Sequence, residues 1–157
     1  MIQILKDSDT RPWFFLQTAH TTYGMWVMET GHLEHLYYGE RITVDSQDPA
    51  SCAPLVIQRA FAPGNTCTYD REHPQISMED VCLEVGTLGK GDIREPFLEV
   101  RFADGSVTSD FTFDSYEIIT LKEREQCLQD SGLPHSYSEV GTDSAECLQI
   151  VLQDVTN

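Results

Sequence analysis

The chain has 157 residues, of which 26 are acidic and 10 basic, for a net charge of -16 at pH 7. This length fits one domain or part of a larger protein. The negative charge repels phosphate groups, which disfavours nucleic acid and anionic membrane surfaces as partners. The start does not read as a secretory signal, and no segment approaches the ~20 apolar residues of a membrane helix. The five cysteines form no CxxC pair, so we expect a cytoplasmic protein with free, buried thiols.

Short apolar runs fill the first forty residues. We predict strands at 14–20 (FFLQTAH) and 22–30 (TYGMWVMET), on either side of a turn at Thr21-Thr22, and a third at 32–42 (HLEHLYYGERI). On that third strand Tyr37 and Tyr38 would point to opposite faces, so one could serve the core and the other an interface.

His32 and His35, on either side of Glu34, form a possible metal-ligand pattern. Residues three apart on a strand point to opposite faces, so one ion could not easily bind both histidines. We therefore expect no metal here, and histidines that lie at the surface or at an interface.

Between Asp45 and Asp92 the alternation gives way to segments rich in Pro, Gly, Asn and Asp. Within them, 54–61 (PLVIQRAF) could hold one or two helical turns. Loops of this length in a compact domain are usually functional or packed against a partner.

The strongest local signal lies at 97–114. Two alternating runs, 97–102 (FLEVRF) and 107–114 (VTSDFTFD), flank Asp104-Gly105, which suits a type I′ turn. We predict a hairpin that pairs the strand around Val100 with the strand around Phe111, with no helix between them. Near the end, 145–155 (AECLQIVLQDV) is predicted as a strand with alternate apolar residues on one face. Many short strands with turns between them predict an all-β, antiparallel β-sandwich with few or no helices.

Five segments in order carry a resemblance to a known family: 26–42 (WVMETGHLEHLYYGERI), 59–80 (RAFAPGNTCTYDREHPQISMED), 88–100 (LGKGDIREPFLEV), 102–113 (FADGSVTSDFTF) and 131–137 (SGLPHSY). In this order and spacing they resemble the N-terminal domain of bacterial α-galactosidases of glycoside hydrolase family 36. The resemblance spans nearly the whole chain, from about Phe14 to Leu152.

The resemblance implies an N-terminal β-supersandwich followed by a (β/α)8 barrel and a C-terminal β-domain. The barrel carries two aspartates, a nucleophile and a general acid/base, which release terminal α-linked galactose with retention from raffinose- or melibiose-type oligosaccharides. Residues 1–157 would then be the N-terminal domain, truncated before the barrel, with no catalytic residue, metal or cofactor of its own. Its implied partners are the barrel of the same chain, a galactoside bound by the parent enzyme, and other subunits of a tetramer.

The resemblance also suggests a sugar-contacting loop at 65–71, where Asn65, Asp70 and Arg71 offer the donors and acceptors that galactose hydroxyl groups need. The alternative is that these residues only cap turns. Some relatives carry an acid at the position of Gln58, so a charged sugar contact is missing there.

The candidates for an apolar interface that is partly exposed in the single chain are Trp13, Trp26 and Tyr38, because aromatic residues are enriched in interface cores. Two other functions stay open: a free-standing carbohydrate-binding module and a structural interaction domain.

Overall fold

The computed structural model describes residues 1–7, 9–45, 48–58, 68–88, 96–120, 123 and 146–156. The described part is all-β, as predicted, with two short 3-10 helices. Its elements are β1 (Ile2–Lys6), β2 (Pro12–Gln17), β3 (Thr21–Val27), β4 (Leu33–Glu40), η1 (Pro49–Leu55), η2 (Met78–Asp80), β5 (Phe111–Thr120) and β6 (Glu146–Asp154). None of the described helices is long and apolar enough to cross a bilayer.

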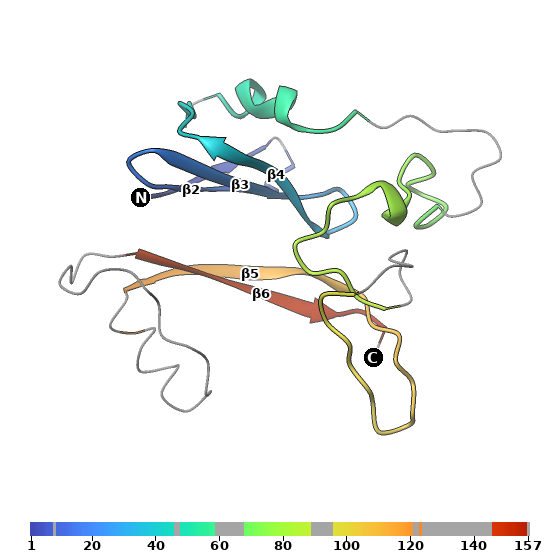
Figure 1. Ribbon diagram of the computed structural model, residues 1–157. Helices are drawn as coiled ribbons and strands as arrows, with labels where there is room; N and C mark the ends of the chain where they lie inside the picture. The colour runs from blue at the N-terminus through green and yellow to red at the C-terminus, as the bar shows by residue number, and fades with distance from the viewer. Residues whose placement is uncertain are drawn as a thin grey trace.

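The first four strands form an antiparallel sheet in the order β1-β2-β3-β4, and β5 pairs with β6 in a second sheet. The two sheets lie face to face, and the segment with η1 covers the opposite side of the four-stranded sheet (Figure 1). The turn between β2 and β3 comes slightly earlier than predicted, because the Thr18 hydroxyl accepts the backbone N–H groups of His20 and Thr21.

The core between the two sheets comes from alternate residues of each strand. Phe14, fully buried in β2, clusters with apolar residues of β3 and β4, and against this cluster pack four residues of the second sheet: Phe113, Tyr116, Leu148 and Ile150. Burying a side chain of this size is worth about 1.5–3 kcal/mol. The predicted apolar face of the last strand is therefore confirmed.

The other face of the four-stranded sheet holds a second core under η1. Trp13 is only 5% exposed, packed with Leu5, Phe15, Val44 and Cys52. The expectation that Trp13 is exposed is therefore wrong. Because β2 is covered on both faces, apolar residues occupy both its odd and its even positions. The sequence pattern of such a strand does not show which face is exposed to solvent.

The predicted turn at Asp104-Gly105 is present, but the pairing is different. Gly105 N–H donates to Phe102 O at 3.0 Å, and Phe102 N–H donates to Ser106 O at 2.9 Å. Only Gly105 has positive φ, at 89°, so the turn has a three-residue loop and is not of type I′.

The prediction that the strand around Phe111 pairs with the residues around Val100 is wrong. Phe111 lies opposite Asp154, and the whole of β5 pairs with β6. The β5–β6 ladder extends from Phe111 to Thr120, so it is longer than any ladder that the arm at 97–102 could form. It sets apolar residues across from one another, for example Tyr116 opposite Ile150. Residues 97–113 contain no helix, as expected.

Replacing Gly105 by Val should lower the free energy of unfolding by about 1–2 kcal/mol, the cost of a left-handed backbone for a residue with a Cβ. A Cβ at this position meets no atom within 4 Å, so strain is the only cause. Gly105→Asn is the matched control and should lose less, because Asn tolerates this conformation. Urea unfolding measures both; equal stability of Gly105→Val and the parent would contradict the assigned turn.

Candidate functional site: a buried polar network and the hairpin beside it

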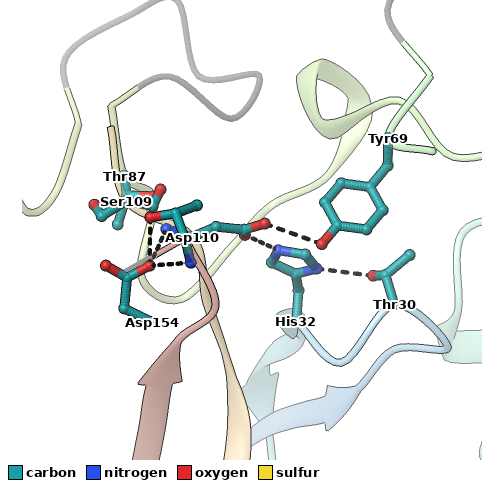
Figure 2. Close-up of polar contacts among 8 residues, drawn as sticks. Thr30, His32, Tyr69, Thr87, Ser109, Asp110 and Asp154 are labelled. Atoms are coloured by element: carbon teal, nitrogen blue, oxygen red, sulfur yellow. Dashed lines mark hydrogen bonds and ion pairs between the residues drawn. The ribbon is translucent and has the colours of Figure 1, made fainter. Parts of the chain in front are cut away.

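A histidine and an aspartate meet where the two sheets come together. His32 lies in the turn between β3 and β4, which closes through a hydrogen bond from Met28 N–H to His32 O at 2.8 Å. Its Nε2 lies 2.7 Å from Asp110 Oδ1, and its Nδ1 lies 2.9 Å from Thr30 Oγ1 (Figure 2). His32 is 3% exposed and Asp110 1% exposed, so this pair is sealed from water.

Further polar contacts extend this network to three other segments. The Tyr69 hydroxyl donates to Asp110 Oδ2 at 3.0 Å, and Asp110 N–H donates to Asp154 Oδ1 at 3.0 Å (Figure 2). Thr87 Oγ1 donates to Ser109 O at 2.7 Å. The network therefore joins the β3–β4 turn to the start of β5, the end of β6 and the loops at 69 and 87.

Proton positions in this network follow from the chemistry of its members. Burial, together with the hydrogen bond to Asp110, raises the pKa of Tyr69 well above its usual range, so its hydroxyl stays protonated and donates. An ionised Asp110 can only accept, so the facing His32 Nε2 carries a proton. Because neither member of the pair is accessible, we assign it a role in holding the segments together.

The two histidines of the sequence pattern lie in different surroundings. His32 is buried, so the prediction that it lies at the surface is wrong; a buried aspartate 78 positions away supplies its partner. His35 is partly exposed, with Nδ1 3.1 Å from Glu84 Oε1. In the part of the chain that the structure describes, no group of three or more His, Cys, Asp and Glu residues could hold a metal ion.

Beside the network lies a small hairpin, residues 68–77, which carries two of the predicted sugar-contacting residues. A bridge between Thr68 and Ser77 closes it. Asp70 Oδ1 accepts the backbone N–H of Glu72 at 2.8 Å and of His73 at 2.7 Å, and also faces His73 Nδ1 at 2.9 Å. Asp70 therefore caps the turn, as the alternative interpretation expects. Asn65 lies outside the described residues.

Arg71 differs from Asp70 in having no local role. It is exposed, and in the described part of the chain it makes no hydrogen bond or ion pair. The hairpin tip thus presents a guanidinium group to solvent, next to a carboxylate whose position is fixed.

A pocket of about 270 Å³ lies along the same hairpin. Its lining combines an aromatic ring, apolar side chains and polar groups: Arg11, Trp26, Met28, Glu29, Val56, Ile57, Gln58, Gln75 and Ile76. Arg11 lies over the Trp26 ring at 5.9 Å and is paired with Asp7 and Asp9. Since two carboxylates offset the charge of Arg11, the pocket suits a neutral ligand with hydroxyl groups better than an anion.

The pocket includes residues that sequence reasoning missed. Arg11, Glu29 and Gln75 come from three separate segments, and Gln75 donates to Glu29 across the pocket. No motif links them, so only the fold could bring them together. Gln58, singled out by comparison with relatives, does line this pocket.

Trp26 and Tyr38, the other two candidates for an apolar interface, are at least partly exposed to solvent. Trp26 is half-buried, and its Nε1–H donates to Glu34 Oε2 at 2.8 Å. Tyr38 is 71% exposed, with its ring 6.0 Å from that of Tyr23. Tyr23 donates to Glu84, and its pKa is raised, first by burial and then by that carboxylate. An exposed aromatic ring thus lies on β4 at Tyr38. Its role in an interface remains a prediction.

The family model described as "Glycosyl hydrolase family 36 N-terminal domain" matches residues 31–157, most of the chain. The chain belongs to this family. The resemblance seen in the five sequence segments is therefore confirmed, and so is the β-sheet fold that it implied.

Two curated relatives of this family 36 domain are bacterial enzymes. The domain is 35% identical over 142 residues to the bifunctional alpha-galactosidase/sucrose kinase AgaSK of Mediterraneibacter gnavus, covering 90% of this chain and 14% of that protein. It is 31% identical to the alpha-galactosidase AgaA of Geobacillus stearothermophilus, covering 90% of this chain and 18% of that one. The chain thus spans less than a fifth of either relative.

Solved structures match this family 36 domain as well. The galactosidase domain of AgaSK superposes with a TM-score of 0.70 at 30% identity, over 98% of this chain and 19% of that one. AgaA from Geobacillus stearothermophilus in complex with raffinose gives 0.70 at 26% identity, over 92% of this chain and 18% of that one. The matched part of each solved chain is small, as in the curated relatives.

Removing one member of the buried pair should be costly. Asp110→Ala leaves His32 and Tyr69 without their acceptor, and breaking a buried pair in this way costs about 3–5 kcal/mol. Asp114→Ala, a change at an exposed position of the neighbouring strand β5, is the matched control and should stay within about 0.5 kcal/mol of the parent. Urea unfolding followed by circular dichroism measures both; equal losses would show that the pair does not hold the domain together.

The Asp70 carboxyl should titrate below its usual pKa, chiefly because His73 donates a hydrogen bond to it. A lowered pKa in the folded state means that this bond stabilises the tip above the unfolded pKa and is lost as pH falls through the folded value, below about pH 4. His73→Ala should raise the pKa of Asp70 part-way, since the backbone N–H bonds remain.

Carboxyl carbon NMR across a pH series measures this titration. Asp104, whose pKa is lowered first by the backbone N–H of Ser106, serves as the internal control and should not respond to His73→Ala. A normal pKa at Asp70 in the parent chain would contradict the assigned turn.

Proposed function

We propose that this chain is the N-terminal accessory and oligomerisation domain of an α-galactosidase. The main support for this proposal is the family match over residues 31–157. A superposition on the galactosidase domain of AgaSK, which covers 98% of this chain, adds to it. In this proposal a (β/α)8 barrel follows the domain in the parent chain and performs the hydrolysis. The domain itself is proposed to contribute no catalytic residue.

The proposed substrates of the parent are raffinose- or melibiose-type oligosaccharides with terminal α-linked galactose. The structure of AgaA in complex with raffinose supports this class. At the hairpin tip, Arg71 supplies donors and Asp70 supplies an acceptor, the groups that a sugar hydroxyl network needs. We propose that the tip approaches the sugar pocket of a neighbouring subunit in a homotetramer.

We also place the parent enzyme in the cytoplasm. The thiols of Cys52, Cys82 and Cys147 are free, which suits a reducing compartment. Cys82 is exposed and Cys147 half-buried, so the expectation that the cysteines are buried holds for Cys52 alone among these three.

A domain exchange tests the function. In AgaA, the segment aligned with this chain is replaced by this chain, and hydrolysis of a nitrophenyl α-galactoside is measured. We expect the chimera to be active and this chain alone to be inactive. The control is AgaA with that segment deleted, which should lose activity because the barrel loses its accessory domain.

Two outcomes would contradict the proposal. Turnover by the isolated, purified chain would mean that it is catalytic. A folded chimera no more active than the deletion control would remove the accessory role. The pocket beside Trp26 favours a free-standing carbohydrate-binding module as the second candidate, and saturable binding of raffinose to the isolated chain together with an inactive chimera would support it.

A further inference from the structure

The hairpin 68–77 is anchored at its base and exposed at its tip. At the base, Tyr69 N–H donates to Ile76 O at 2.8 Å, and Ile76 is buried in a cluster with Met28, Met78 and Val81. At the tip, Arg71 and its neighbour Glu72 are exposed. This apolar cluster holds the returning arm at Ile76, and the ring of Tyr69 in the outgoing arm packs against it as well.

Tyr69 makes the polar anchor. Its hydroxyl donates to Asp110 Oδ2 at 3.0 Å, and its ring meets the His32 ring edge-on, with 4.9 Å between centroids (Figure 2). Asp110 is itself held from the other side by Asp154. The Tyr69 phenol thus ties the hairpin to the contact between the two sheets.

The tip lies directly beyond this anchor. Asp70 follows Tyr69 in the chain, and its carboxylate accepts the N–H groups of Glu72 and His73. The direction in which Asp70 leaves the base therefore sets the geometry of the whole tip, Arg71 included.

We propose that Tyr69 is a positioning residue: through Asp110 it transmits the fixed geometry of the sandwich to the hairpin tip that carries Asp70 and Arg71. Removing its hydroxyl group loosens the tip while the sandwich stays folded. What the tip then contacts rests on the proposed function; the coupling between Tyr69 and the tip does not.

Hydrogen exchange by NMR on Tyr69→Phe tests the coupling in the 157-residue chain. The net worth of one hydrogen bond, about 1 kcal/mol, corresponds to roughly fivefold faster exchange. We expect that increase at the amides of Glu72 and His73, which bond to Asp70, while unchanged chemical shifts in β2 and β3 show that the sandwich keeps its fold. Tyr38→Phe, which alters an exposed tyrosine, is the matched control and should change neither region.

Two results of that experiment would overturn the inference. One is unchanged exchange at the tip in Tyr69→Phe. The other is a loss of the native chemical shifts of β2 and β3, which would mean that Tyr69 is needed for the fold of the sandwich as a whole.

The AgaA chimera tests the consequence for the reaction separately. There Tyr69→Phe should raise KM several-fold with kcat nearly unchanged, because the tip contributes to binding away from the reacting bond. A loss of kcat with KM unchanged would overturn the positioning role. An inactive parent chimera would remove the proposed function and leave the exchange result standing.

Discussion

The contact between His32 and Asp110 constrains the rest of the domain. Both side chains are almost completely removed from water, and a carboxylate in such a place is tolerated only when hydrogen-bond donors surround it. The donors are His32 in the β3–β4 turn and Tyr69 in the hairpin 68–77. The backbone N–H of Asp110, which directly precedes β5, donates in turn to Asp154 of β6. All of these segments must therefore be in place at the same time, and this requirement selects one arrangement of the two sheets.

Around this contact, the four-stranded sheet acts as the middle layer. The second sheet covers one of its faces and the segment with η1 covers the other, so β2 contributes apolar side chains in both directions (Figure 1). Gly31 lies at the joint: its φ of 83° allows the tight turn, and its carbonyl accepts the N–H of Phe113 at 2.7 Å. Backbone and side-chain contacts thus close the sandwich at the same end.

The exposed features lie around this rigid centre and fit a domain that works beside other parts of an enzyme. The hairpin tip, the pocket along it and the exposed ring of Tyr38 all belong to segments that buried apolar clusters hold in place. The surface is strongly acidic overall, and even the arginine in the pocket is balanced by two carboxylates. Contacts with a neutral sugar or with a neighbouring polypeptide suit this chemistry better than contacts with an anion.

The family resemblance and much of the fold were open to prediction from the residues. Alternating polarity identified runs at 107–114 and 145–155 that overlap β5 and β6, an apolar run at 32–42 identified β4, and Asp104-Gly105 identified a turn. These features are local: a two-residue period and a glycine with positive φ do not depend on distant partners. For the same reason Asp70 could be expected to cap a turn.

Partner choice and burial depend on residues far apart in the chain, and only the tertiary structure decided them. The residues at 97–102 precede the strand around Phe111 as a possible hairpin arm, yet the partner of that strand is β6, which sets apolar residues opposite those of β5. Trp13 is buried because the segment with η1 covers its face of the sheet, and His32 is buried because Asp110, 78 positions away, can accept its hydrogen bond. Local pattern determined which segments are strands; long-range packing and the need to pair a buried carboxylate determined how they are arranged.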